Sequence, residues 1–297
     1  MVSTLSIFTT VFLVPVLASF ILNIIFQKPP ADHGKGTMFD LIASRYDFIN
    51  RALALNLDIG WRKVMVKEVT SDGNLFLGTE PVRVLDLATG TADVAILMAK
   101  EYNQKNSEHI SKFQNIDILG VDPSANMISV GREKVKKENL TDKITLDLGD
   151  ARNLKDLESD FFHAATMSFG IRNVPEKQQA LCEIHRVLKK EEGDVKGAKF
   201  GILEFSEPGD DFGIMGMGAR LFIRHVVPVF GALLSGAPRE YMHLQNSIAD
   251  FPSPKEFANL METLQCGDKN TGTFRVDDVI QLNFGSVQLY LATPIYT

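Results

Sequence analysis

The sequence predicts a doubly wound α/β fold built on a mostly parallel sheet. Short apolar runs, which suit buried parallel strands, alternate along the chain with longer amphipathic segments, which suit helices. Acidic residues stand where several of the apolar runs end, and the carboxyl ends of parallel strands form the ligand-binding edge of such a sheet. A chain of 297 residues, 45% of them hydrophobic, is long enough for one large domain of this kind.

Each element follows from the spacing of apolar residues. Two helices are expected first, over 38–57 and from Trp61 onward. In the later helix over 176–190, apolar residues line one face, and polar residues such as His185 are expected on the other. The five predicted parallel strands are 82–87, 117–121, 144–148, 162–169 and 200–205. The other predicted helices are 92–102, 127–138 and 254–264, and two antiparallel strands around 283–286 are expected to end the chain over 274–295.

The N-terminus differs in kind from the rest of the chain. Leu5–Phe26 contains no charged residue, and about 20 apolar residues suffice to cross a bilayer as a helix. This run favours a hydrophobic membrane-anchor helix; a cleaved targeting leader and a buried helix remain alternatives. The expected organisation is therefore an anchor or targeting segment over 1–27, a linker over 28–37 and one domain over 38–297.

Composition and cysteine content exclude several classes of partner. The net charge is −6, so the chain as a whole lacks the basic surface of a nucleic-acid-binding protein. Cys182 and Cys266 lie far apart without a paired spacing, which suggests neither a disulfide framework nor a zinc site. We expect two ordinary reduced thiols and no bound metal.

The turn after the first strand indicates a nucleoside cofactor. The segment 86–92 (DLATGTA) contains one glycine, whereas a dinucleotide-binding fingerprint has three. Asp122 follows the turn by about 30 residues, later than the roughly 20 expected of an acid in a dinucleotide site. The arrangement suits S-adenosylmethionine better than NAD.

Three acids at successive strand ends then receive separate roles. Asp86 suits the methionine ammonium, Asp122 can accept both ribose hydroxyls, and Asp150 can accept from the adenine amino group. The backbone N–H of Ala151 can donate to a ring nitrogen. Each acid alone has a second interpretation as a helix cap or a solvated side chain, and the three together favour the cofactor.

The sequence resembles the UbiE-type C-methyltransferases of ubiquinone and menaquinone biosynthesis. Most of residues 38–265 takes part, and the segments 168–174 (SFGIRNV) and 45–47 (RYD) are the most specific. The other matching segments are 38–44 (MFDLIAS), Asn50, 61–62 (WR), 84–88 (VLDLA), 90–91 (GT), Asp93, Met127, 131–134 (GREK), 186–189 (RVLK), 203–206 (LEFS), Tyr241, Leu244 and 247–248 (SI).

This resemblance implies a Rossmann-like class I methyltransferase domain and a prenylated quinol as substrate. The cofactor contacts that it implies are Thr91, Asp122, Asp150, Ala151 and Ser168, with Gly90 in the matching turn. Three features depart from the family: Thr89 and Ala92 replace turn glycines, a charged loop occupies 191–197, and the last strand lacks the usual histidine. The Cβ atom of either turn residue could crowd the cofactor.

Methylation of an aromatic carbon requires an aligned, electron-rich ring. Removing a proton from a ring hydroxyl supplies the electron density. Arg172 is the leading candidate to hold the phenolate, because an arginine stays protonated. Tyr46 and Asp47 are candidates for shaping or deprotonating the substrate, and His225 and Tyr241 are alternatives. Arg172 and Tyr46 also have purely structural interpretations, as an ion-pair partner and as core packing.

The leading hypothesis is a membrane-anchored quinol C-methyltransferase. The ring, benzoquinol or naphthoquinol, stays open, as does the organelle, mitochondrial inner membrane or plastid. The alternatives are a catalytically silent cofactor- or quinone-binding member of a membrane complex, motivated by Thr89 and Ala92, and a methyltransferase for another small lipophilic substrate. The apolar stretch 221–234 is either core or a cover for the isoprenoid tail or the bilayer. A homodimer or a place in a quinone-biosynthesis complex is a further expectation.

Overall fold

The computed structural model describes residues 14–25, 36–40, 43–71, 81–108, 115–191, 196–236, 238–267 and 271–296. Most of the expected linker and the first half of the expected N-terminal anchor lie outside the described residues.

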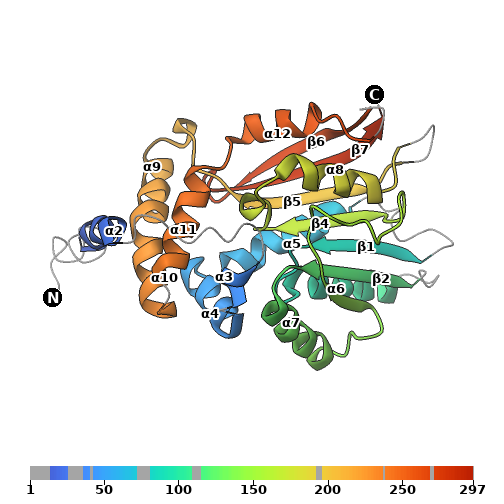
Figure 1. Ribbon diagram of the computed structural model, residues 1–297, viewed down its shortest axis with the longest axis horizontal. Helices are drawn as coiled ribbons and strands as arrows, with labels where there is room; N and C mark the ends of the chain where they lie inside the picture. Colours follow the sequence, from blue (N-terminus) through green and yellow to red (C-terminus); the bar gives the residue numbers. More distant parts are fainter. Residues whose placement is uncertain are drawn as a thin grey trace.

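A seven-stranded sheet forms the centre of the fold (Figure 1). Its strand order is β3-β2-β1-β4-β5-β7-β6; β1 to β5 are parallel, and β7 runs antiparallel to both β5 and β6. The predicted mostly parallel sheet with a C-terminal hairpin is confirmed. The strands are β1 (Val82–Leu87), β2 (Ile116–Asp122), β3 (Ile144–Leu148), β4 (Ala164–Ser168), β5 (Lys199–Phe205), β6 (Gly272–Leu282) and β7 (Val287–Tyr296).

Helices cover both faces of the sheet and bury two apolar clusters. One cluster joins strand side chains to α5 (Leu57–Val69), α6 (Asp93–Glu108) and α7 (Ala125–Lys137). The other joins them to α8 (Lys177–Val187) and α12 (Pro254–Glu262). Because the central strands are buried on both sides, their sequences read as nearly continuous apolar runs.

The remaining helices gather beyond one end of the sheet (Figure 1). They are α3 (Thr37–Asp40), α4 (Ala43–Leu53), α9 (Gly213–Leu221), the π-helix η4 (Phe222–Val226), α10 (Val227–Ser235) and α11 (Pro238–Ala249), with short 3-10 turns η2 (Ile171–Asn173) and η3 (Asp210–Phe212). The single helix expected over 38–57 does not continue to its predicted end. Its last turn is interrupted at Leu55 and Asn56, whose φ angles are 52° and 62°. This end of the sheet holds the candidate site.

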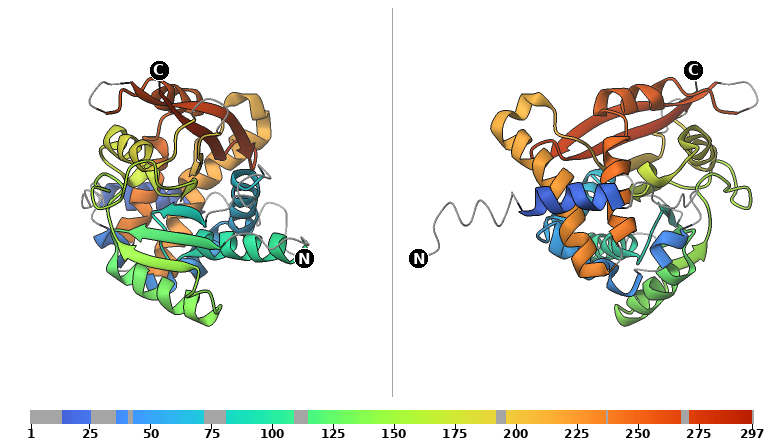
Figure 2. Two further views of the ribbon diagram at one scale, coloured as in Figure 1. Left: turned by 90° about the vertical axis from the view of Figure 1, so that its right-hand side faces the viewer. Right: turned by 60° about the vertical axis from the view of Figure 1, so that its left-hand side comes forward.

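The apolar N-terminal run contains the helix α2 (Val14–Ile25). This helix contacts η4, α10 and α11, and it lies across the last two in the right-hand view of Figure 2. The structure therefore describes α2 as packed on the helices at the carboxyl end of the sheet. That the first 27 residues anchor the protein in a membrane stays a prediction.

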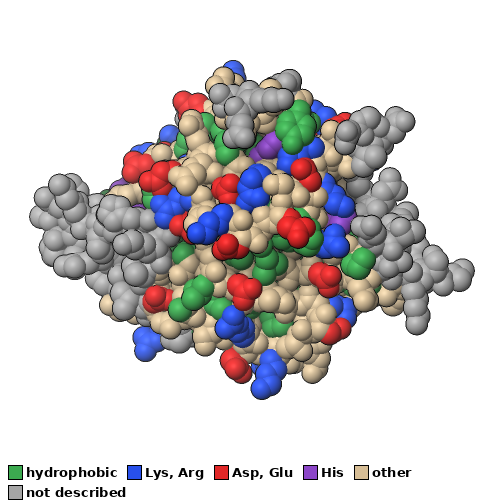
Figure 3. Space-filling model, turned by 45° about the vertical axis from the view of Figure 1, so that its right-hand side comes forward, with side chains coloured by type: hydrophobic (Ala, Val, Ile, Leu, Met, Phe, Trp, Pro, Cys, Tyr) green, Lys and Arg blue, Asp and Glu red, His purple; other side chains and the backbone are tan. Residues whose placement is uncertain are grey.

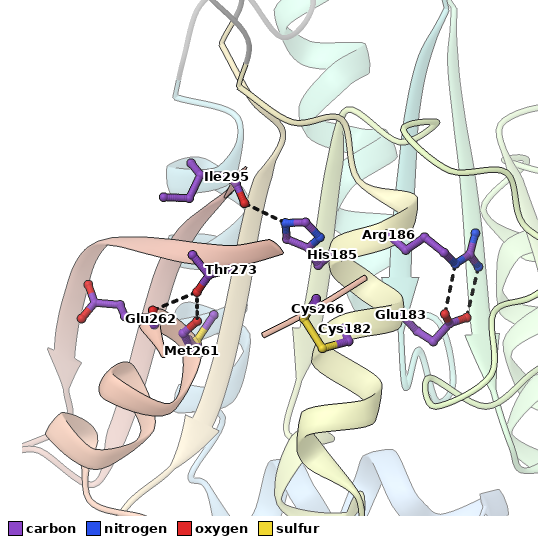
Figure 4. The surroundings of a disulfide bond; sticks show 9 residues. All are labelled: Cys182, Glu183, His185, Arg186, Met261, Glu262, Cys266, Thr273 and Ile295. Atoms are coloured by element: carbon purple, nitrogen blue, oxygen red, sulfur yellow. Dashed lines mark hydrogen bonds and ion pairs between the residues drawn. A yellow bond between two sulfur atoms is a disulfide. The ribbon is translucent and has the colours of Figure 1, made fainter. Parts of the chain in front are cut away.

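A disulfide corrects the expectation of two reduced thiols. Cys182 of α8 is bonded to Cys266, which follows α12, although 84 positions separate them in the sequence (Figure 4). The pairing has no local sequence signature, because only the packing of α8 beside β6 brings the two segments together. His185, expected on the polar face of α8, is also buried here, and its ring contacts Phe274 edge-on.

Removing this disulfide is expected to destabilise the protein. Closing a loop of this length restricts the unfolded chain, so replacing both cysteines with alanine should lower the free energy of unfolding by about 2–4 kcal/mol. Urea denaturation of the double variant and the parent measures the difference. Dithiothreitol should destabilise the parent and leave the double variant unchanged. Two titratable thiols in the unfolded, unreduced parent would contradict the bond.

Candidate active site

The site is built around the turn between β1 and α6. Ala88, Gly90 and Ala92 all have positive φ, of 49°, 55° and 66°, and the Thr89 N–H donates to the Val121 carbonyl at 3.1 Å. A Cβ at Gly90 would meet no atom within 4 Å, so that side of the turn is open. The turn thus presents bare backbone to the space beyond the sheet, as a cofactor-binding turn must.

Thr89 and Ala92, which replace turn glycines of the family, do not face this space. Thr89 and Ala92 are buried, and neither lines a cavity. The Thr89 hydroxyl donates downward to Asp86 at 2.6 Å, and the Ala92 side chain packs toward Gly131. The crowding that these two residues suggested is therefore absent, because their Cβ atoms point away from the open side of the turn.

Asp86 lies beneath the turn rather than in the cavity. It is 1% exposed, and its two carboxylate oxygens accept hydrogen bonds from the Thr89 and Thr166 hydroxyls. Burial raises the pKa of Asp86 to about 6, against the lowering effect of these hydrogen bonds. In this structure Asp86 shapes the turn, and its contact with the methionine ammonium stays a prediction.

A small cavity of about 80 Å³, lined by both polar and apolar side chains, opens beside the turn. Asp122, at the end of β2, lines it and accepts from the Gly90 and Ser124 N–H groups, each at 2.9 Å. Each carboxylate oxygen has a second lone pair available, as two ribose hydroxyls would require. Asp122 therefore joins the ligand position directly to the backbone of the turn.

A second group of residues was predicted to contact the adenine end of the cofactor. Asp150 and Ala151 line the same cavity, as predicted. The Arg152 side chain donates hydrogen bonds to both carboxylate oxygens of Asp150, at 3.0 and 2.6 Å. Burial acts to raise the pKa of Asp150, but the hydrogen bonds from Arg152 outweigh it and hold the pKa below its usual range. Asp150 is thus an ionised acceptor at neutral pH.

Ser168 gives an independent sign that a polar ligand belongs here. It ends β4 and lines the small cavity, and its Oγ is buried without a hydrogen-bond partner among the described residues. A buried hydroxyl without a partner is costly, so such groups commonly mark ligand positions. The open glycine, the acceptor carboxylates and this hydroxyl together fit S-adenosylmethionine.

The cover of this cavity comes from the first helices of the domain. Gly36, Phe39 and Tyr46 line it from above. Asp40 holds the cover down, since its carboxylate accepts from the Ser124 hydroxyl at 2.5 Å and from the Asn126 N–H at 3.1 Å. Ligand pockets usually measure about 300 Å³ or more, so we expect the cover to shift outward when the cofactor enters.

Burial gives cofactor binding a pH dependence. It raises the pKa of Asp122 to about 6, although the Ser124 and Gly90 N–H groups act to lower it. The ionised carboxylate is the better acceptor for ribose hydroxyls, so affinity should be constant above pH 7 and fall as the pH drops through about 6, by up to about tenfold per unit. Calorimetric titration with S-adenosylmethionine measures this profile. An unchanged profile in Asp122→Asn would assign it to another group.

Thr91 and Asp47 lie outside both cavities. The Thr91 hydroxyl donates to Asp47 at 2.7 Å, and the Lys134 ammonium contacts Asp47 at 2.8 Å and Asp93 at 2.6 Å. Arg51 of α4 completes the cluster by pairing with Asp93. Asp47 was a candidate for deprotonating the substrate; in the structure it ties α4 to the cofactor turn and to α7, which is a positioning role.

A second cavity, of about 590 Å³, adjoins the first and is mostly apolar. Phe39, Tyr46, Phe169 and Asn173 line both cavities, so they form the wall between them. Burial raises the pKa of Tyr46 above its ordinary value, although the charges of Arg172 and Arg62 oppose the shift. Tyr46 therefore keeps its proton at neutral pH and has a hydroxyl that can donate a hydrogen bond. Its role in shaping or deprotonating the substrate stays a prediction.

Arg172 lines the large cavity and is held from behind by a buried carboxylate. Its Nη1 donates to Glu204 at 2.5 Å and to the Phe169 carbonyl at 2.9 Å; the Glu204 side chain is fully buried. The predicted phenolate-holding residue thus has a fixed position, and its Nε–H is a buried donor without a partner among the described residues.

Several residues in or beside the lining of the large cavity were given no role from the sequence. Asn173 belongs to the hexapeptide that was singled out, but no role was assigned to it. Glu204 and the pair Asp58–Arg62, both buried beside the large cavity, were also missed. A buried strand that contains an acid, as β5 does at Glu204, is the signal that could have found one of them, because such an acid needs a partner. His225 lines neither cavity, and the side chain of Tyr241 lies outside what the structure describes.

Comparison with known proteins identifies the family. A profile of the ubiE/COQ5 methyltransferase family matches residues 31–272. The chain belongs to this family. Its members include a demethylmenaquinone methyltransferase of Deinococcus radiodurans, 36% identical over 79% of this chain and 88% of that protein. The ubiquinone/menaquinone biosynthesis C-methyltransferase UbiE of Geobacter sulfurreducens is 37% identical over 76% of this chain and 78% of its own length.

Solved structures support the class of fold for this ubiE/COQ5 family member. A candidate S-adenosylmethionine-dependent methyltransferase of Methanococcus maripaludis superposes with a TM-score of 0.51 at 14% identity, over 86% of this chain and 92% of that one. Phosphoethanolamine N-methyltransferase 1 of Haemonchus contortus, solved with S-adenosylhomocysteine, gives 0.50 at 10% identity, over 96% of this chain and 50% of that one. At these identities the likeness concerns the fold alone. Within the described part of the chain, no three His, Cys, Asp or Glu side chains cluster as metal ligands would.

Proposed function

We propose that the protein transfers a methyl group from S-adenosylmethionine to a ring carbon of a prenylated quinol, in ubiquinone or menaquinone-type biosynthesis. The observation that carries this proposal is the pair of adjoining cavities. The small one is the more polar of the two, with Asp122, Asp150 and Ser168 in its lining; the other is large and mostly apolar. A nucleoside cofactor suits the first and a lipophilic ring with a tail suits the second.

The shared wall defines where the ring would react. S-adenosylmethionine supplies an electrophilic methyl group, so the enzyme's task is to align the ring and to raise its electron density. Arg172 lines the large cavity, and its guanidinium, whose buried Nε–H has no partner among the described residues, can donate to a ring oxygen and favour its phenolate form. Tyr46, which belongs to the helical cover and keeps its proton, can orient the same ring by donating a hydrogen bond.

The apolar lining of the large cavity suits the long isoprenoid tail of a prenylated quinol. Residues of α9 and η4 face the large cavity together with aromatic side chains of the sheet, so most of the lining offers no hydrogen bond. An isoprenoid chain buried there would gain roughly 25 cal/mol for each Å² removed from water. The ring would then be held at the polar wall and the tail beneath the helices.

We place the protein at a membrane, in the mitochondrial inner membrane or a plastid, with the apolar N-terminal run as its attachment. The absence of charge from Leu5 to Phe26 supports attachment, and the solubility of prenylated quinols in bilayers gives it a purpose. A homodimer or a place in a biosynthetic complex remains an expectation from the sequence. The motive for a catalytically silent member falls away, because Thr89 and Ala92 do not face the cofactor cavity.

The decisive experiment is a methylation assay with two rings. Purified protein is incubated anaerobically with S-adenosylmethionine and a chemically reduced demethyl-benzoquinol or demethyl-naphthoquinol, and products are identified by mass spectrometry. Ring methylation of either quinol is the expected result, and the preferred ring names the pathway. Cofactor binding without methylation of either ring would overturn the proposal and favour another lipophilic substrate. Asp147→Ala, an exposed substitution on β3, serves as the matched active control.

A further inference from the structure

The mouth of the large cavity is ringed by exposed apolar side chains. Five of the large hydrophobic residues that line the cavity are also largely open to solvent. They come from three separate parts of the chain: the α4–α5 turn, the start of α9 and the β6–β7 turn. They are Leu55 (72% exposed), Leu57 (48%), Ile214 (82%), Met215 (64%) and Phe284 (54%), and we call them the rim.

Two rim residues are held at an added backbone cost. Leu55 and Phe284 have φ angles of 52° and 55°, in the left-handed region that bulky residues rarely adopt. Each costs roughly 1–2 kcal/mol there relative to glycine, and each places its side chain in water rather than in the core. Folding does not benefit from either feature, so the rim is better explained by something that covers it.

The apolar surface continues over the same end of the molecule. α9, α10 and α2 expose further large side chains: Val14, Leu17, Ile21, Met217, Leu221, Phe230, Leu233 and Leu234. By length and composition alone, Gly213–Ser235 is long and apolar enough to cross a membrane, yet only 28% of an apolar 18-residue stretch within it is buried. Figure 3, which brings forward the opposite end of Figure 1, shows acidic and basic side chains interspersed there. The two ends of the molecule differ in polarity.

The apolar N-terminal residues favour a lipid bilayer as the partner that covers the rim. Residues 1–13 precede α2 and contain no charged side chain. They join the molecule at α2, which packs on η4, α10 and α11 (Figure 2). A segment of this composition that enters a bilayer brings α2 and its neighbours to the surface of that bilayer. The rim belongs to α9 and to the two turns at the same end.

We propose that the rim docks on a lipid bilayer, so that the mouth of the large cavity opens into the membrane rather than into water. A substrate dissolved in the bilayer then enters between Ile214, Met215 and Phe284 without crossing solvent. Large exposed apolar patches commonly mark such contacts. The contact is hydrophobic in origin, because the rim contains no charge and the whole chain has a net charge of −6. The substrate class rests on the proposed function; the docking surface does not.

A fluorescent label placed at the rim tests this contact in the full-length protein. Met215→Cys and Phe284→Cys are labelled with a polarity-sensitive fluorophore, since Cys182 and Cys266 are already bonded to each other. The vesicles are phosphatidylcholine, alone or mixed with anionic phosphatidylglycerol, each with and without a lipid-borne quencher. We expect a blue shift and quenching at both rim positions, and the same result at high salt. Leu148→Cys is the matched control: it is 61% exposed, lies at the far edge of the sheet on β3, and should show neither effect.

Three outcomes separate the possibilities. Vesicles that float with the protein while the rim labels stay unquenched would overturn the proposal, because attachment would then rest on the N-terminus alone. Rim labels that are quenched only with anionic lipid would overturn its hydrophobic basis. Rim labels quenched as expected in a protein that methylates no quinol would support the docking surface and overturn the proposed function. Introducing Met215→Asp should abolish quenching of the label at position 284.

Discussion

Replacing Asp122 with alanine is expected to weaken the binding of S-adenosylmethionine by about 100-fold or more. Asp122 lines the small cavity and is the one acid there that also holds the turn, through the Gly90 and Ser124 N–H groups. A hydrogen bond to a charged group contributes about 1.5–3 kcal/mol, so losing the two bonds to the ribose hydroxyls costs at least about 3 kcal/mol, and a 100-fold change in affinity corresponds to about 2.8 kcal/mol. Isothermal titration calorimetry measures the change.

The control separates this loss from a general effect of removing an acid. Asp147→Ala removes an exposed carboxylate from the neighbouring strand β3 and should leave the affinity unchanged. Thermal unfolding of both variants shows whether the turn has loosened, since Asp122→Ala leaves two N–H groups without their acceptor. A folded Asp122→Ala protein with the affinity of the parent would exclude the carboxylate from the cofactor site.

Replacing Arg172 is expected to lower turnover without changing cofactor affinity. Arg172 lines the large cavity and not the small one, so S-adenosylmethionine should bind as before. Removing a donor that stabilises a developing oxyanion typically costs about 10²–10³ in kcat. Alanine alone would leave Glu204 charged and buried, at a cost of about 3–5 kcal/mol in stability. The informative variant is therefore Arg172→Ala combined with Glu204→Gln.

Glu204→Gln alone is the matched control for that experiment. It keeps the guanidinium and a hydrogen-bond acceptor but removes the buried negative charge, so kcat should fall far less than in the double variant. The quantities to compare are kcat, KM for the quinol and the Kd of S-adenosylmethionine. A raised KM with an unchanged kcat would assign Arg172 to ground-state binding of the ring rather than to the phenolate.

Strands were predictable because the centre of a doubly wound sheet is buried on both faces. The predicted bounds of 82–87 coincide with β1, which is buried along nearly its whole length. The bounds of 144–148 coincide with β3, an edge strand in which the buried Ile144 and Leu146 alternate with exposed residues. The helix expected over 38–57 was less accurate, since its apolar spacing continues past Leu53. The break at Leu55 and Asn56 has no glycine or proline to mark it, and a leucine at positive φ could not be anticipated from propensity.

Cofactor residues could be predicted where their side chains lie at or beyond the carboxyl ends of the parallel strands. Asp122, Asp150 and Ser168 do so, and all three line the small cavity. Asp86 does not, because it stands one residue before the end of β1 and its side chain is turned into the packed interior. The distant partners, such as Cys182 with Cys266, were inaccessible because no local pattern records a contact made only by tertiary packing.

The ion pairs around Thr91 have a consequence for the order in which ligands bind. Through Asp47 they fasten the cofactor turn to α4, and α4 supplies Tyr46 and Asn50 to the wall of the large cavity. We expect a ligand that moves the turn to move part of the other site as well, which would be a coupling free energy between the two. Such coupling is reciprocal. The factor by which the bound methyl donor changes the affinity for the ring is therefore the factor by which the bound ring changes the affinity for the methyl donor.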